Sequence, residues 1–263
     1  TRCSRDWSSD VCSSDLFGPV RSRRLGVSLG INLLPTDSKV CSFDCIYCEC
    51  GWTKSMTSGS LPSREDVRRA LDKKLAEMQF NGDELDVITF AGNGEPTLHP
   101  DFEGIIDDTI KIRNHYFPQA RIAVLSNSTM IHRTEVVEAL KRIDQNILKL
   151  DSAFDSTIQL LNQPMMKFDV KTLVEGLKSF NGNLIIQTLF VRGKIKGQVV
   201  NNTTTQEIDA WIKLVAEIKP KEVMIYSIAR DTPVNDLEKI SIEELQSIAK
   251  KIELLGIPVH VSS

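Results

Sequence analysis

Short apolar runs alternate along this chain with longer segments in which apolar residues recur at every third or fourth position. The apolar runs have the length of strands, and they occupy residues 27–34, 85–91, 121–125, 146–150, 184–190 and 222–227, with a shorter one at 258–261. The longer segments predict helices at 102–116, 134–142, 206–218 and 242–255, and from about 63, 155 and 170 onward. Strands and helices therefore alternate over most of the sequence.

This alternation is typical of βαβ units, which build parallel sheets. No internal repeat or low-complexity linker divides the chain, so the sequence predicts an α/β fold in a single domain. Ligands of parallel α/β sheets bind at the carboxyl ends of strands. Polar residues follow three predicted strands, at 93–96, 126–128 and 151–152, and we expect the functional site there. The polar stretch 192–205 is expected to be a loop, either facing a substrate or merely solvated.

Three cysteines, Cys41, Cys45 and Cys48, lie within eight residues in the spacing C-x3-C-x2-C. Thiolates select zinc, copper(I) or iron–sulfur clusters. Since no cysteine follows Cys50 and the four histidines are scattered, a closed zinc site of two ligand pairs is not indicated. Three thiolates would leave one iron of a four-iron cluster open to a substrate or cofactor.

Two plainer interpretations stand beside this one. The three cysteines could be small buried hydrophobic residues, although their spacing follows neither strand nor helix period. Cys50 comes two residues after Cys48, which is a poor spacing for another ligand of the same cluster, and it is interpreted as a spare thiol near the site.

With Tyr47 just before its last cysteine, the motif resembles the signature of the radical S-adenosylmethionine (SAM) enzymes. The flanks at 17–26, 30–35 and 51–53 resemble a subgroup of iron–sulfur oxidoreductases related to the tRNA wybutosine-synthesis enzyme, 4-demethylwyosine synthase. The resemblance runs from about Phe17 to the C-terminus. It implies a partial (β/α)6 TIM-like barrel with a parallel sheet.

The resemblance also implies a chemistry. Cys41, Cys45 and Cys48 would hold a [4Fe–4S] cluster, and SAM would chelate the fourth iron. One electron from the reduced cluster, supplied by a donor such as flavodoxin or ferredoxin, would cleave SAM to methionine and a 5′-deoxyadenosyl radical that abstracts hydrogen from a substrate.

The family places a Gly-Gly-Glu-Pro-like motif against the amino group of SAM, and residues 93–96 resemble it. Gly94 and Glu95 are the expected contacts, whereas Asn93 stands where the first glycine is usual. Glycine allows close backbone approach and a carboxylate accepts hydrogen bonds from an ammonium, but the same residues also build simple turns.

Further cofactor contacts are expected at the next strand ends and in the cysteine loop. Ser126 and Asn127 could contact the carboxylate or ribose of SAM, or could form a helix cap or an Asx turn. Asp151 could lie near the ribose or cap a helix. Tyr47 could stack near the adenine or pack inside its loop.

Basic residues before the first predicted strand form a small cluster of Arg21, Arg23 and Arg24. It belongs to the subgroup's pattern and could bind an anionic substrate, or it could be a solvated basic face. The segment 226–233 resembles a family segment that lines the adenine or substrate side.

Composition narrows the setting. The chain has 263 residues, 41% of them hydrophobic, and a formal net charge of −3, which gives no general attraction to nucleic acid or anionic membrane. No apolar run approaches the length of a membrane span, and no charged start followed by an apolar stretch indicates a signal peptide. A thiolate-held cluster suits a reducing compartment, so a cytoplasmic location is predicted.

Residues 1–16 differ from the rest because they are rich in Ser and Asp and lack periodicity, and the run 10–16 resembles a translated sequencing-adaptor end. They are predicted to be a non-native or disordered tail before a core domain at 17–263, and Cys3 and Cys12 are not counted as ligands.

The substrate is left open among small molecules, proteins and tRNA. Against tRNA stand the net charge and the lack of a large basic stripe. The tRNA enzyme also uses a second cluster with upstream cysteines, which occur here only in the tail. A non-enzymatic iron–sulfur electron carrier or zinc protein is the alternative from another class.

Overall fold

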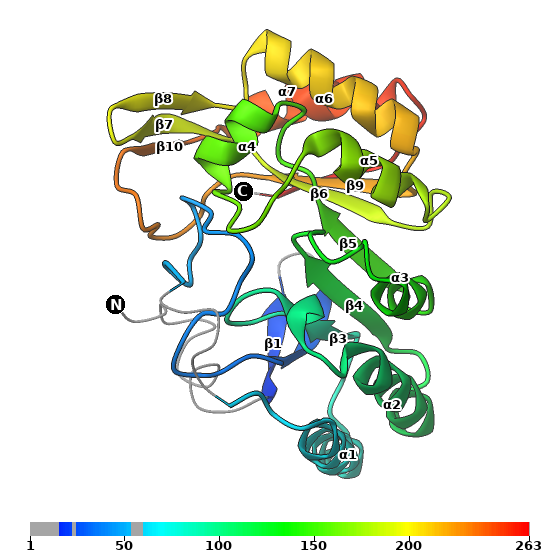
Figure 1. Ribbon diagram of the computed structural model, residues 1–263. Helices are drawn as coiled ribbons and strands as arrows, with labels where there is room; N and C mark the ends of the chain where they lie inside the picture. The colour runs from blue at the N-terminus through cyan, green and yellow to red at the C-terminus, as the bar shows by residue number, and fades with distance from the viewer. Residues whose placement is uncertain (1–15, 23–24, 54–59, 263) are drawn as a thin grey trace. The chain divides into compact units, whose positions relative to one another are not determined.

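The computed structural model describes residues 16–22, 25–53 and 60–262 and divides them between two compact units (Figure 1). The first unit takes its described residues from Thr1–Cys41, Thr53–Ser126 and His132–Asn146, and the second from Ser42–Trp52, Asn127–Ile131 and Ile147–Ser263. Cys41 therefore belongs to the first unit, while Cys45 and Cys48 belong to the second.

The sheet of the first unit has the strand order β1-β2-β3-β4. Its strands are β1 (Leu16–Ser22), β2 (Gly26–Ile31), β3 (Val87–Phe90) and β4 (Arg121–Ser126). The β1–β2 pair is antiparallel, whereas β2, β3 and β4 run parallel. Its helices are α1 (Arg64–Asn81), the 3-10 turn η1 (Pro96–Leu98), α2 (Phe102–Tyr116) and α3 (Thr134–Lys141).

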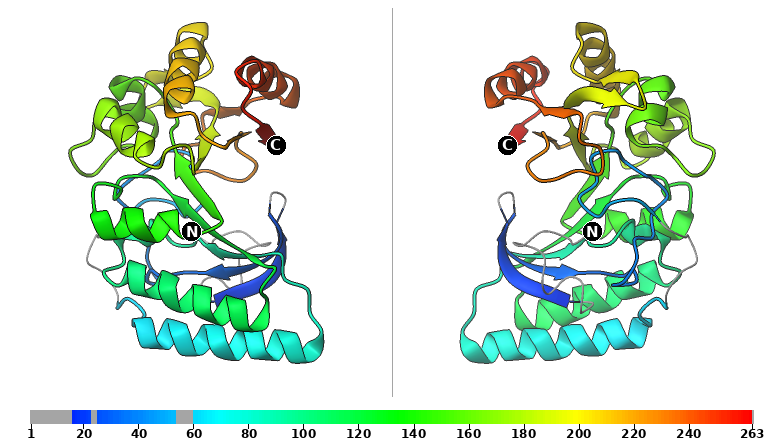
Figure 2. Two further views of the ribbon diagram at one scale, coloured as in Figure 1. Left: turned by 90° about the vertical axis from the view of Figure 1, so that its right-hand side faces the viewer. Right: turned by 90° about the vertical axis from the view of Figure 1, so that its left-hand side faces the viewer.

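Local sequence accounts for the bounds of α1. The Ser63 side chain accepts a hydrogen bond from the backbone N–H of Asp66, as expected of an N-cap, and Gly82 ends the helix in the left-handed conformation at φ +73°. Val67, Leu71, Leu75 and Met78 form its buried face. Helices α1 and α2 pack side by side along this unit (Figure 2).

The main sheet of the second unit has the order β5-β6-β9-β11, all parallel. Its strands are β5 (Gln145–Lys149), whose first two residues belong to the first unit, β6 (Ile185–Leu189), β9 (Glu222–Tyr226) and β11 (Val259–Ser262). A second, antiparallel sheet joins β7 (Val191–Ile195), β8 (Gln198–Asn201) and β10 (Leu237–Lys239). The helices are α4 (Asp155–Leu161), α5 (Val170–Lys178), α6 (Thr205–Ile218) and α7 (Ile242–Glu253).

The strand register of the second unit separates an apolar face from a polar one. Leu148, Ile186 and Val223 are paired neighbours with no exposed surface. The next residue on each of these strands also pairs with its neighbour, and these residues form a row with His260 of β11: Lys149, Gln187, Met224 and His260. Since paired residues of parallel strands point to the same face and successive residues alternate, the polar row lies on the opposite face.

The predicted α/β class with a mostly parallel sheet is confirmed, and every predicted strand and helix is present. The prediction that 192–205 is a loop is wrong, because β7, β8 and the start of α6 fill most of it. Lys196 and Gly197, at φ +48° and +81°, form the hairpin turn, and Lys-Gly lacks the Asn-Gly signature of such turns. The strands β1 and β10 were also not predicted.

The single core domain at 17–263 and the tail at 1–16 stay predictions. Residues 1–15, including Cys3 and Cys12, lie outside the described residues, as do Arg23 and Arg24. No helix in the described ranges is both long and apolar enough to cross a membrane.

Candidate functional site

Residues 42–48, here called the cysteine loop, are paired with the segment that follows α4. The N–H of Asp44 donates to the carbonyl of Gln163 at 3.2 Å, and the N–H of Ile46 donates to that of Leu161 at 3.0 Å. In return the N–H of Met165 donates to the carbonyl of Ser42 at 2.9 Å. The loop then turns so that the N–H of Cys48 donates to the carbonyl of Cys45 at 3.0 Å. The loop is therefore shaped by protein hydrogen bonds.

A second anchor ties the loop to the segment after β4. The Asn127 amide nitrogen donates to Ser42 Oγ at 2.8 Å. Asn127 Oδ1 accepts from the N–H and the hydroxyl of Thr129, at 3.0 and 2.8 Å, in an Asx turn. Asn127 was predicted to contact the cofactor, and its amide group is engaged within the protein.

A buried polar cluster surrounds Cys45 and Tyr47. The Tyr47 hydroxyl donates to Asp151 Oδ2, and the other Asp151 oxygen accepts the N–H of Leu189 at 2.9 Å. The Asn162 nitrogen lies 2.7 Å from Asp151 Oδ2, 2.9 Å from the Tyr47 oxygen and 3.3 Å from Cys45 Sγ. Both oxygens of Asp151 are thus bonded to protein groups.

Lys149 supplies the positive charge of this cluster. Its ammonium lies 3.6 Å from Asp151 Oδ2 and 3.3 Å from the Tyr226 hydroxyl, over the rings of Tyr47 and Tyr226 at 5.2 and 5.6 Å. Burial is the largest single influence and would lower the pKa of Lys149, but Asp151, Tyr226 and Cys45 together outweigh it and hold that pKa above its usual range. The lysine is therefore a fixed cation.

Burial raises, rather than lowers, the pKa of Cys45 and Tyr47 in the loop. Desolvation raises the pKa of the Cys45 thiol to about 11, although the Lys149 charge partly opposes the rise. Desolvation, reinforced by the Asp151 charge, also raises the pKa of Tyr47 well above its usual range.

In the first unit, the segment before Cys41 pairs with the turn after β3. The N–H of Val40 donates to the carbonyl of Asn93 at 2.9 Å, and the N–H of Glu95 donates to the carbonyl of Val40 at 3.1 Å. Gly94, between them, has φ +140°, and a Cβ there would lie 1.7 Å from the Val40 oxygen. Glycine is therefore required at this crossing.

The other residues of this turn have structural partners too. The buried Asn93 amide donates to the carbonyls of Pro35 and Thr36, both at 3.1 Å, which explains asparagine where the motif that this turn resembles has glycine. The Glu95 carboxylate accepts the N–H of Thr97 at 3.1 Å and caps η1. Ser126 is buried as the last residue of β4.

The predicted site residues thus fall into two groups. Tyr47, Asp151 and Cys45 meet in the second unit, with Asn127 bonded to the same loop, whereas Gly94, Glu95 and Ser126 belong to the first unit. Sequence reasoning missed Lys149 and Asn162. Asn162 looks like the ordinary polar end of a short helix, and no sequence signal places it near Cys45, 117 positions away.

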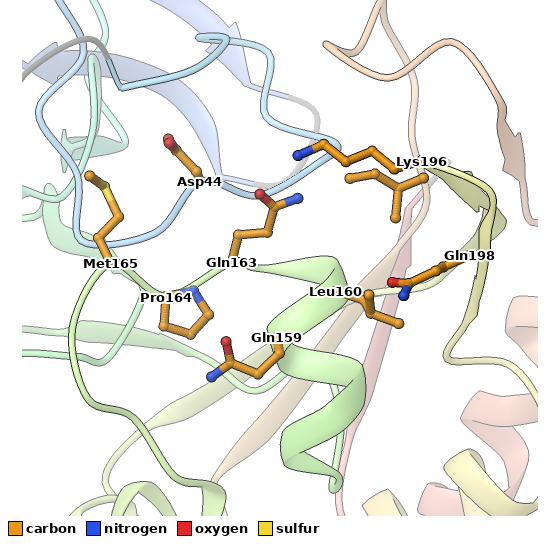
Figure 3. A pocket seen from close by; sticks show the side chains of 9 residues that line it. Asp44, Gln159, Leu160, Gln163, Pro164, Met165, Lys196 and Gln198 are labelled. Carbon is orange, nitrogen blue, oxygen red and sulfur yellow. The ribbon is translucent and has the colours of Figure 1, made fainter.

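A cavity of about 450 Å³ opens beside the loop in the second unit (Figure 3). Asp44 lines one side, Gln159 and Gln163 come from α4 and its C-terminal turn, and Lys196 comes from the β7–β8 hairpin. Pro164 and Met165 add apolar surface. Its size suits a small ligand or one side chain of a larger one.

The cysteine loop offers thiol donors of the kind that an iron–sulfur cluster needs. Within residues 16–22, 25–53 and 60–262, no three His, Cys, Asp or Glu side chains converge as a preformed metal site. The donor chemistry nevertheless fits, because Cys45 and Cys48 are thiols joined by one backbone turn, with an amide N–H and a fixed cation beside Cys45.

Comparisons with known proteins agree with this chemistry. The model of the radical SAM superfamily matches residues 36–191. A UPF0026 protein of Synechocystis sp. is 29% identical over 273 residues, covering 93% of this chain and 95% of the relative. A Brachyspira hyodysenteriae protein named GTPase Obg is 31% identical over 249 residues, covering 93% of this chain and 34% of that protein. The chain therefore spans only about a third of the Brachyspira relative.

Two solved structures show the same fold at low identity. A radical SAM methyltransferase from Sphaerobacter thermophilus has a TM-score of 0.63 at 15% identity, over 89% of this chain and 65% of that one. Archaeal TYW1 has a TM-score of 0.52 at 13% identity, over 86% of this chain and 71% of that one. At these identities the likeness establishes the fold alone.

Proposed function

Because the chain belongs to the radical SAM superfamily, we propose that it uses a [4Fe–4S] cluster to cleave S-adenosylmethionine reductively and abstract hydrogen from a substrate. Cys41, Cys45 and Cys48 are the proposed iron ligands. When bound, the cluster and SAM supply a 5′-deoxyadenosyl radical; the protein supplies binding, orientation and exclusion of water.

The observation that carries the proposal is the cysteine loop with its surroundings. Backbone hydrogen bonds to the segment after α4 fix the loop, and Cys45 is buried next to an amide donor and within the field of Lys149. Metal binding requires the thiols to lose their protons; burial opposes this at Cys45, and the Lys149 charge partly offsets the effect of burial. A buried Cys45 with the half-buried Cys48 one backbone turn away suits a metal centre that must be shielded from water.

The proposed cofactor contacts are Gly94 and Glu95, Ser126 and Asn127, and Tyr47 and Asp151. The Asp151 carboxylate and the Asn127 amide are bonded to protein groups. We therefore propose that Asp151 and Asn127, besides contacting the cofactor, hold the polypeptide around it. Gly94, in the turn after β3, allows the close approach of Val40, the residue before Cys41, since a side chain there would meet the Val40 carbonyl oxygen.

The experiment is anaerobic. The full chain is reconstituted with iron and sulfide, reduced, mixed with SAM and assayed for 5′-deoxyadenosine. Wild type is expected to form it, and Cys45→Ala is expected to form none. Cys50→Ala is the matched control, because it removes a neighbouring thiol outside the proposed ligand set. Full activity in Cys45→Ala would refute the assignment of Cys45 as an iron ligand.

Two alternatives give different results in the same preparation. An iron–sulfur electron carrier would load iron yet form no 5′-deoxyadenosine, and its EPR signal would not respond to SAM. Zinc without iron and sulfide would indicate a structural metal site. The electron donor, for which flavodoxin or ferredoxin is proposed, is replaced in this assay by a chemical reductant.

A further inference from the structure

Asn162 lies just past the C-terminal end of α4 and has no exposed surface. Its N–H donates to the carbonyl of Ile158 at 2.8 Å, and the next residue, Gln163, turns the chain at φ +44°. The carbonyl before it, that of Leu161, accepts the N–H of Ile46. These backbone bonds place the Asn162 side chain beside Cys45.

The orientation of the Asn162 amide is fixed by its neighbours. The Asp151 oxygen that lies 2.7 Å away also accepts the Tyr47 hydroxyl, so the nitrogen end of the amide must face it. The same nitrogen lies 3.3 Å from Cys45 Sγ. The Asn162 oxygen is buried and has no hydrogen-bond partner in the described part of the chain. The side chain is thus used as a donor alone.

The amide thus leaves a buried oxygen unpartnered, a cost that a leucine of similar size would avoid. The amide nitrogen has two hydrogens for three acceptors, Asp151, Tyr47 and Cys45. A bond to sulfur strengthens as negative charge on the sulfur grows. Such charge grows when an iron centre held by that sulfur takes up an electron.

We propose that Asn162 is a positioning residue for Cys45, and that its N–H···S hydrogen bond raises the reduction potential of the iron–sulfur centre at that ligand. The proposal rests on the proposed function, because it takes Cys45 as an iron ligand. Hydrogen bonds to ligand sulfurs are among the features that set such potentials. Lys149 acts on the same thiol through its charge, and the test leaves it in place.

The test compares full-length Asn162→Leu, which keeps the bulk and removes the donor, with wild type. Gln159→Leu is the matched control, because it removes an exposed amide from the same helix without touching Cys45. Asn162→Gln restores an amide donor. After anaerobic reconstitution, iron and sulfide are quantified, folding is checked by circular dichroism, and the midpoint potential is titrated by EPR without SAM.

The expected result is a more negative potential in Asn162→Leu at equal iron content, an unchanged potential in Gln159→Leu, and partial return toward wild type in Asn162→Gln. Folded Asn162→Leu that loads no iron, with loading regained in Asn162→Gln, also supports the positioning role. If Asn162→Leu does not fold, Asn162→Ala, which also lacks a side-chain donor, takes its place in the same titration.

Equal potentials in wild type and the donor-free variant, at equal iron content, would overturn the inference and leave the proposed function standing. Wild type that retains no iron and sulfide would instead refute the proposed function itself. The two failures are therefore distinguishable.

Discussion

The contacts of Gly94 and Asn93 with the backbone before Cys41 explain why glycine and asparagine occupy these positions. Asn93 bonds two carbonyls of the preceding loop, and Gly94 lets Val40 pair with the turn. The sequence singled out Gly94 because a glycine after a strand suggests close approach. It could not assign Asn93, since its partners Pro35 and Thr36 lie 58 and 57 positions away.

Gly94→Ala is expected to destabilise the protein by about 3 kcal/mol or more, because it combines a disfavoured φ with a clash against the Val40 oxygen. Urea unfolding of the apo-protein measures it. Gly82→Ala is the matched control: its φ is +73°, nothing lies within 4 Å of the added carbon, and a cost of about 1 kcal/mol is expected. Similar losses in both variants would contradict the clash.

The same limit on sequence reasoning applies to the centre of the site. The cysteine spacing and Tyr47 could be singled out from local sequence alone. The partners of Tyr47, Asp151 and Asn162, are 104 and 115 positions away, so the hydrogen-bonded cluster follows only from the folded chain. Asp151 was predicted to lie near the ribose. Its hydrogen bonds to Tyr47 and Leu189 could not be predicted, because they form only when distant parts of the chain pack together.

At the scale of elements, hydrophobic periodicity predicted the helices and parallel strands because each buries a continuous apolar face. It missed the hairpin β7–β8, whose residues Lys194, Lys196, Gln198 and Val199 are exposed. A small sheet with an exposed edge leaves little hydrophobic signal, and its turn uses a lysine at φ +48°.

Lys196→Asn is expected to stabilise the protein by about 0.5 kcal/mol, because asparagine tolerates the left-handed conformation that this turn requires. The urea midpoint measures the change. Lys194→Asn, at an exposed position inside β7, is the control and is expected to be neutral or slightly destabilising, since asparagine is disfavoured in strands. A lower midpoint for Lys196→Asn would show that the turn is not strained.

Helices α1 and α2 are joined by a two-point ion pair. Arg64 donates to Asp108 at 2.7 and 2.9 Å, and this hydrogen bonding holds the pKa of Asp108 below its usual range. A carboxyl with a lowered pKa stabilises the fold above its unfolded pKa, near 3.9, and loses that contribution as pH falls through the folded pKa.

Asp108→Asn is therefore expected to cost up to about 1 kcal/mol at neutral pH, because Arg64 is half exposed. The difference from wild type should shrink as pH falls below about 4. Urea unfolding at pH 7, 5 and 3 measures it. A difference that does not depend on pH would mean that packing, not charge, is lost.

At the scale of the whole molecule, charge bears on the choice of substrate. The chain carries 32 basic and 35 acidic residues. Binding to tRNA is expected to be weaker than about 1 μM at physiological salt, with a shallow salt dependence. Filter binding at several salt concentrations checks this. Tight binding with a steep salt slope would favour the tRNA-modifying alternative.

The protein hydrogen bonds that shape the cysteine loop bear on how the enzyme survives damage. Oxygen destroys exposed iron–sulfur centres, and a loop organised only by its metal would collapse each time. Here residues 42–46 keep their pairing with 161–165 through backbone bonds that contain no metal. On the proposed assignment of the cluster to this loop, repair reduces to replacing iron and sulfide in a loop that is already shaped, with no refolding step. A protein that has lost its cluster in air is expected to regain it over repeated cycles of reconstitution with iron and sulfide.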